Sequence, residues 1–178
     1  MFLSSLHSGK PDVQPQALAA YRVEYQKKAR DNARTPMHWD ITPHAGFTHH
    51  TSTPWMRAHP NHTTINAASQ LQDPTSVFHT WRAVLQARKD YKHIFIYGDF
   101  ALVDAANPRV FAYSRTARNG SAALVVCNYS AEEVLWNGWE GSVVEVLVGD
   151  PGKTVGSFGA DGVRLGPYEG VAVLVKKA

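Results

Sequence analysis

The sequence predicts an α+β chain in which helical segments come first and short antiparallel strands follow. Apolar residues recur at three- and four-residue spacings from about residue 15 to 29 and from 73 to about 89, as on one face of a helix. After Tyr91 the pattern changes to short β-branched and aromatic runs separated by turn residues, which is typical of antiparallel strands. With 178 residues, 44% of them hydrophobic, the chain can supply a core.

The amino-terminal part contains an irregular segment and one helix. Residues 1–14 show no periodicity and contain Ser, Gly, Pro and Asp, so we expect a ragged lead-in. Residues 15–29 are predicted to be helical, and Glu24 stands four positions before Lys28, the favourable order for an ion pair on a helix surface.

A second helix is predicted from Asp73, as N-cap, to about Lys89, with Pro74 in the first turn. The residues on its predicted apolar face are Val77, Phe78, Trp81, Val84, Leu85 and Arg88. Burying one large apolar side chain stabilises by roughly 1.5–3 kcal/mol. We therefore expect this face to pack on the sheet that follows, or to drive self-association or aggregation through Val77, Phe78, Trp81 and Leu85.

The remainder, residues 92–178, is predicted to be an antiparallel β-sandwich. Seven runs are expected as strands: Ile94 to Tyr97, Phe100 to Val103, Val110 to Ser114, Ala122 to Asn128, Val143 to Val148, Val163 to Leu165 and Gly170 to Val175.

The first predicted helix leads into a polar turn, Arg-Asp-Asn-Ala-Arg-Thr-Pro-Met-His-Trp-Asp, at residues 30–40. Pro36 disfavours helical geometry at Thr35, so the chain should be irregular or extended here. Guanidinium groups on such a loop suit oxygen-rich ligands. Alternatively, Arg30 and Arg34 lie at a helix C-terminus, compensate its dipole and pair with nearby aspartates.

Composition excludes several classes of function. The net charge of +3 comes from scattered residues, so no face suited to nucleic acid is predicted. The single cysteine, Cys127, is expected to be buried and inert, and fits a reducing compartment. The sequence shows neither a secretory signal nor a membrane-length apolar run, so we expect a soluble cytoplasmic protein without a membrane partner.

Residues 40–72 form a long irregular stretch with His44, His49, His50, His59 and His62. Adjacent imidazoles can bind zinc, but no Cys, Asp or Glu completes a ligand set between residues 47 and 72. We therefore predict a solvated loop, with neither a metal nor a cofactor.

These motifs resemble the C-terminal part of α-glucosidases of glycoside hydrolase family 13, the maltase, isomaltase and oligo-1,6-glucosidase type. The resemblance covers about residues 20–175. It rests on the Arg-Asp-Asn-Ala-Arg-Thr-Pro-Met run and on His44-Ala45-Gly46-Phe47-Thr48, Pro54-Trp55, Asn66-Ala67-Ala68, the run from Asp73 to His79, Arg88-Lys89 and the Pro-Tyr-Glu turn before Gly170.

The resemblance implies that residues 15–91 come from the end of a (β/α)8 barrel and that a Greek-key β-sandwich follows. It also implies that Arg30 reaches the terminal glucose of an α-glucosidic oligosaccharide, while Arg34 mainly shapes the loop. His38 stands where many relatives have glutamine. A barrel takes about 250 residues, more than the 178 of this chain. None of the family's catalytic carboxylate motifs occurs, so no catalytic residue is assigned and the chain alone is expected to be inactive.

A different class remains open, namely a β-sandwich module that binds carbohydrate or protein without catalysis. Trp136 and Trp139 could form a stacking pair for a sugar. Equally, a strand and turn could bury both rings.

Overall fold

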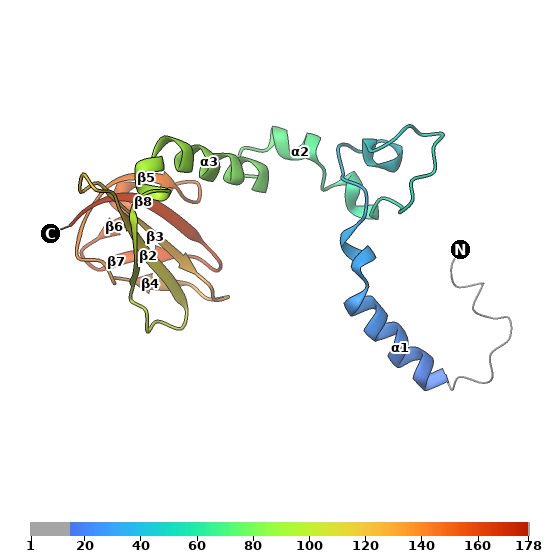
Figure 1. The fold of residues 1–178 in the computed structure, drawn as a ribbon, viewed down its shortest axis with the longest axis horizontal. Coiled ribbons are helices and arrows are strands. Elements are labelled where there is room, and N and C mark those ends of the chain that lie inside the picture. The colour runs from blue at the N-terminus through green and yellow to red at the C-terminus, as the bar shows by residue number, and fades with distance from the viewer. Residues whose placement is uncertain (1–14, 178) are drawn as a thin grey trace. The chain divides into compact units, whose positions relative to one another are not determined.

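A computed structural model describes residues 15–177 of the chain (Figure 1). It divides into two compact units, one ending at Ser69 and one beginning at Gln70, which we call the loop unit and the β unit. The lead-in expected at residues 1–14 lies outside the described residues.

The loop unit begins with helix α1, Pro15–Lys28, which confirms the helix predicted there. Glu24 and Lys28 form the expected ion pair at 2.6 Å. The rest of the unit is irregular apart from three short 3₁₀ turns: η2 (Arg30–Ala33), η3 (Pro43–Gly46) and η4 (Pro60–Thr63).

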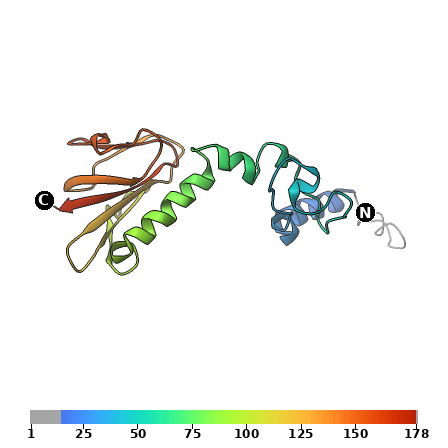
Figure 2. The same ribbon diagram turned by 90° about the horizontal axis from the view of Figure 1, so that it is seen from above.

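Two more helices precede the sheets, of which only the second was predicted; the first lies within the stretch 40–72 that was expected to be irregular. The short helix α2 spans Ala67–Gln72, and α3 spans Val77–Asp90 (Figure 2). The sequence predicted Asp73 as the N-cap of α3, but the N-cap is Ser76. The Asp73 carboxylate instead accepts hydrogen bonds from the backbone and hydroxyl of Thr75. This local turn competes with helix formation, so α3 starts three residues later, where Ser76 accepts from the backbone N–H of His79.

The predicted strand Ile94 to Tyr97 is wrong, because helix α4, Lys92–Phe95, occupies this position. Short apolar runs do not distinguish strand from buried helix by their periodicity. Part of this apolar run is nevertheless buried, because Ile94 lies in a small buried cluster with Ala117 and Ala123.

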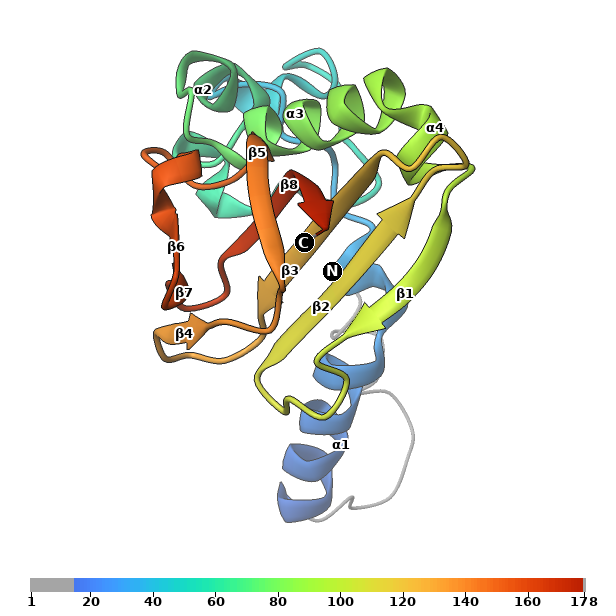
Figure 3. The same cartoon turned by 90° about the vertical axis from the view of Figure 1, so that its left-hand side faces the viewer.

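Eight strands form two antiparallel sheets within the described residues (Figure 3). The larger sheet has the order β1-β2-β3-β8-β5 and the smaller β4-β7-β6. The strands are β1 (Asp99–Val103), β2 (Val110–Thr116), β3 (Ala122–Asn128), β4 (Val134–Trp136), β5 (Gly141–Val148), β6 (Phe158–Gly159), β7 (Gly162–Leu165) and β8 (Gly170–Lys177), with a 3₁₀ turn, η5 (Val155–Ser157), before β6. Six of the seven predicted strands are confirmed, whereas β4 and β6 were not predicted.

Both sheets contribute to one buried cluster. Leu124 and Val173 enter it from the larger sheet, and Trp136 and Leu165 enter it from the smaller one. Inward-facing residues alternate with outward-facing ones along β2, as expected for a sheet with one buried face.

A hydrogen bond and an ion pair of Glu169 hold the turn before β8. The Glu169 carboxylate accepts from the backbone N–H of Gly166 at 2.7 Å and pairs with the Lys153 ammonium at 2.7 Å. Both side chains are largely shielded from solvent. The pair therefore holds the Pro-Tyr-Glu turn against the loop that follows β5, where Lys153 lies.

The apolar face of α3 is exposed. None of the fourteen side chains of this fully described helix is buried, and Val77, Trp81 and Leu85 are each more than half exposed. The helix does contact β5 of the larger sheet, but the sheet leaves these apolar side chains exposed, so packing on the sheet does not bury this face. Among residues 15–177, no helix combines the length and apolar character needed to span a membrane.

Candidate functional site

The arginine loop directly follows α1. Arg30 opens the η2 turn at the point where the backbone N–H of Ala29 closes the last helical turn onto Tyr25. The guanidinium of Arg34 lies 4.6 Å from the ring centre of Trp55, a cation–π contact between two parts of the loop unit. Arg30 is exposed, so its charge is accessible to a ligand.

A strained turn follows the arginine loop. His44 and Ala45 both have φ of 58°, a conformation that is uncommon for residues other than glycine. Ala45 is fully buried, and its carbonyl accepts from the backbone N–H of Trp39 at 2.8 Å. The turn thereby fixes the end of the arginine loop.

Asp40 stabilises the same turn. Hydrogen bonds from the hydroxyl and the backbone N–H of Thr42 lower the pKa of the Asp40 carboxyl, and the charge of His62 contributes less. Gly46 packs against this carboxylate so closely that a Cβ there would lie 2.7 Å from both oxygens.

The sequence predicted a solvated loop at the histidines of residues 40–72, but several of the histidine rings contact one another. His49 and His50 are adjacent rings with centres 4.2 Å apart, but a different group also forms. His38, from the arginine loop, lies beside His59 and His62 of the η4 turn. As the side chains stand, no three His, Cys, Asp or Glu groups within residues 15–177 form a metal site.

The loop unit shows no acid–base pair for glycoside hydrolysis among its described contacts. A retaining glycosidase needs two carboxyl groups about 5–5.5 Å apart. Glu24 is paired with Lys28, and Asp40 is engaged by Thr42. These carboxylates hold local structure, and neither is placed as a nucleophile with a second acid beside it.

The β unit has a shallow cleft of about 420 Å³ beside the loop between β1 and β2, where Asp104, Arg109 and Tyr129 contribute to its lining. The Asp104 carboxylate accepts hydrogen bonds from Trp136 Nε1 at 3.0 Å and from Asn107 at 2.8 Å. These hydrogen bonds give the Asp104 carboxylate a structural role.

The two tryptophans proposed as a stacking pair do not form one. Trp136 is 3% exposed and belongs to the core, and Trp139 packs against that core.

Cys127 is half-buried rather than fully buried, and burial raises the pKa of its thiol. A thiol with a raised pKa is a poor nucleophile at neutral pH.

The family described as "Alpha amylase, catalytic domain" matches residues 10–98. The chain belongs to the alpha-amylase family.

Curated relatives agree with this family. The chain is 37% identical over 155 residues to oligo-1,6-glucosidase of Halalkalibacterium halodurans, covering 84% of this chain and 26% of the relative. It is 37% identical over 111 residues to α-glucosidase of Schizosaccharomyces pombe, covering 62% of this chain and 19% of the relative. The chain thus spans about a quarter or less of these proteins.

The solved structure of trehalulose synthase from Pseudomonas mesoacidophila is similar, with a TM-score of 0.71 and 35% identity. The similarity covers 83% of this chain and 26% of the synthase.

Proposed function

We propose that this chain is the C-terminal part of an α-glucosidase that removes terminal α-linked glucose from maltose-, isomaltose- or sucrose-type oligosaccharides with net retention. In this proposal, residues 15–91 are the end of a (β/α)8 barrel and residues 92–178 form a Greek-key β-sandwich. The arginine loop carries the proposal. The chain contains the Arg-Asp-Asn-Ala-Arg-Thr-Pro-Met run, and its relatives are named oligo-1,6-glucosidase and alpha-glucosidase.

The proposal gives the two arginines of the loop different roles. Arg30 is exposed and binds the terminal glucose once a barrel is present. Arg34 lies over Trp55 and shapes the loop. No described carboxylate pair supports chemistry by the chain alone, so the isolated chain does not hydrolyse substrate. The lone cysteine supports a reducing compartment, and on that ground we place the protein in the cytoplasm.

The direct test is hydrolysis of an aryl α-glucoside by the purified 178-residue chain, alone and mixed with the barrel part of a relative. We expect activity only in the mixture. In that mixture, Arg30→Ala should lower kcat/KM roughly tenfold to hundredfold, because charge-assisted hydrogen bonds contribute about 1.5–3 kcal/mol.

The matched control is Arg22→Ala, which removes an exposed arginine from α1 and should leave kcat/KM unchanged. Turnover by the isolated chain would refute the inactive-part proposal. Equal activity of wild type and Arg30→Ala in the mixture would refute only the role of Arg30.

Self-association follows from the exposed face of α3, and we assign a second copy of the chain to it. Trp81 is 62% exposed on this face. We expect the isolated chain to sediment as a dimer or larger species, and Trp81→Gln to shift it toward monomer. Arg82→Gln, at the neighbouring exposed position, serves as the control. A monomeric wild-type chain would contradict this expectation.

A further inference from the structure

A row of aromatic rings lies on the face of the larger sheet that points away from the shared core. Phe111 and Tyr113 are two residues apart on β2, so they share this face, and their ring centres lie 5.5 Å apart. Phe100 of β1 extends the row beyond Tyr113 at 5.2 Å. Tyr129, just after β3, extends it beyond Phe111 at 6.3 Å.

This row leads into the cleft beside the β1–β2 loop, which we call the aromatic cleft. Phe111 and Tyr129 contribute to its lining, and they are 41% and 68% exposed. Contiguous exposed apolar surface of this kind marks interaction sites or ligand-binding grooves. The rings therefore offer their faces to a ligand.

Two charged groups of opposite sign line the same cleft, the Asp104 carboxylate and the Arg109 guanidinium. The hydrogen bonds from Trp136 Nε1 and from the Asn107 amide both go to Asp104 Oδ2. Among the described residues, the other oxygen, Oδ1, accepts no hydrogen bond. The fold thus fixes this carboxylate through one oxygen and leaves the second for a ligand.

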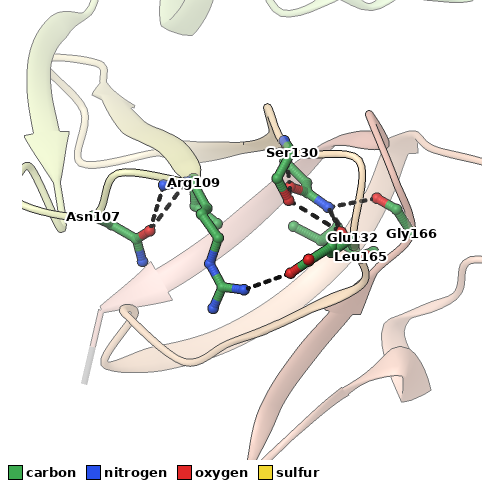
Figure 4. Close-up of polar contacts among 8 residues, drawn as sticks. Asn107, Arg109, Ser130, Glu132, Leu165 and Gly166 are labelled. Atoms are coloured by element: carbon green, nitrogen blue, oxygen red, sulfur yellow. Dashed lines mark hydrogen bonds and ion pairs between the residues drawn. The ribbon is translucent and has the colours of Figure 1, made fainter.

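The Arg109 guanidinium is also available. It pairs with Glu132 at 3.6 Å, and both side chains are more than half exposed (Figure 4). Exposed ion pairs of this kind contribute little free energy. The guanidinium can therefore exchange this contact for a ligand oxygen at small cost.

The loop that carries both charges is held by its own hydrogen bonds. Asn107 Oδ1 accepts from the backbone N–H groups of Arg109 at 3.0 Å and Val110 at 3.1 Å. The backbone N–H of Tyr129 donates to the Arg109 carbonyl oxygen at 2.8 Å. The polar and aromatic parts of the cleft are therefore positioned in advance, which reduces the entropic cost of binding.

This lining selects the chemistry of the ligand. Arg109 repels a cation and Asp104 repels an anion, so a neutral molecule is favoured. A carboxylate accepts hydrogen bonds and a guanidinium donates them, which suits hydroxyl groups because they do both. The aromatic faces require an apolar surface on the same molecule. A sugar ring combines C–H groups on its face with hydroxyl groups around its edge.

We propose that the aromatic cleft binds a neutral oligosaccharide of α-linked glucose. Phe111 and Tyr129 stack on its sugar rings, while Asp104 Oδ1 and Arg109 bind its hydroxyl groups. The cleft volume of about 420 Å³ lies within the range of small-molecule sites, about 300–1,000 Å³. The choice of α-linked glucose rests on the proposed function, whereas the site itself requires neither the arginine loop nor a barrel.

The sequence did not suggest this site, because its rings meet only through strand pairing. Phe111 pairs with Cys127, so Tyr129, two residues further along, lies beside the start of β2. The residues that drew attention instead were Trp136 and Trp139, which belong to the core or pack against it.

The test is calorimetric titration of the full 178-residue chain with maltotriose. We expect saturable binding with a Kd of roughly 1 mM or below. Tyr129→Ala should weaken binding roughly threefold to tenfold, because it removes one aromatic face. Arg109→Gln should weaken it roughly tenfold, because it removes a charged hydrogen-bond donor.

Tyr97→Ala is the matched control. It removes a tyrosine that is equally exposed but does not line the cleft, so the wild-type affinity should remain. Circular dichroism checks that each variant keeps its fold. Absence of saturable binding by the wild-type chain would overturn the proposal, as would wild-type affinity in both Tyr129→Ala and Arg109→Gln.

Arg30→Ala separates this site from the arginine loop. Loss of maltotriose binding in Arg30→Ala, with wild-type affinity in Tyr129→Ala, would assign the sugar to the arginine loop and overturn the cleft proposal. Hydrolysis in the mixture with a barrel is measured independently of the cleft. The cleft proposal and the proposed function can therefore fail separately.

Discussion

Replacement of Gly162 by alanine is expected to lower the free energy of unfolding of the β unit by roughly 2–5 kcal/mol. Gly162 has φ of +106° at the start of β7, a conformation that side-chain-bearing residues rarely adopt. A Cβ there would lie 2.2 Å from the carbonyl oxygen of Trp136. Because that oxygen belongs to the backbone of the paired strand β4, neither side can move without breaking the smaller sheet.

Gly120→Ala is the matched control. Gly120 also has a positive φ, +85°, but an added Cβ would meet nothing within 4 Å. It should therefore show only the conformational penalty of about 1–2 kcal/mol. Urea unfolding followed by tryptophan fluorescence measures both variants. Equal losses would show that the close approach to β4 is not limiting.

Replacement of Asn128 by alanine is expected to destabilise the β unit by about 3 kcal/mol. The Asn128 side chain is buried and donates to the carbonyl oxygens of Glu132 at 2.7 Å and Gly166 at 2.8 Å. Its oxygen accepts from the backbone N–H of Ser130 at 2.9 Å. It thus connects the end of β3 to the loops before β4 and β8. Figure 4 labels three of the residues that it contacts, Ser130, Glu132 and Gly166. Removing it takes away the acceptor of the Ser130 backbone N–H and one of the two hydrogen bonds at each of the Glu132 and Gly166 carbonyl oxygens, which keep donors in Ser130 Oγ and the Glu169 backbone N–H.

The control for Asn128 is Asn119→Ala. Asn119 lies on an exposed turn, where its side chain accepts one hydrogen bond from the backbone of Ser121. The expected loss there is roughly 0.5–1.5 kcal/mol. Thermal unfolding of the two variants should differ clearly in midpoint. A loss for Asn128→Ala no larger than that for Asn119→Ala would contradict the role assigned to the buried amide.

The sequence predicted the longer elements well, because periodicity needs length to be read. Strand β3 was placed with its observed ends. Strand β6 has only two residues, and β4 has three, so neither offers enough alternation to recognise. The start of α3 was misplaced because Asp73 can cap a turn as well as a helix.

The candidate site was predictable only where it is local in sequence. The arginine loop was identified from its own residues, whereas the Arg34–Trp55 contact and the His38 group depend on tertiary approach. The burial of Trp136 was one of two open alternatives. It is decided by the pairing of β4 with β7 and by the hydrogen bond to Asp104.

The lack of buried side chains on α3 affects its local stability. A helix of fourteen residues is marginal in water without tertiary packing. Its support comes from its contacts with β5 and α4, from the Ser76 cap and from the contact of Tyr91 with Glu145 just beyond its end. Its amide protons should exchange through local opening of the helix, long before those of β3 and β8, which are released only by global unfolding.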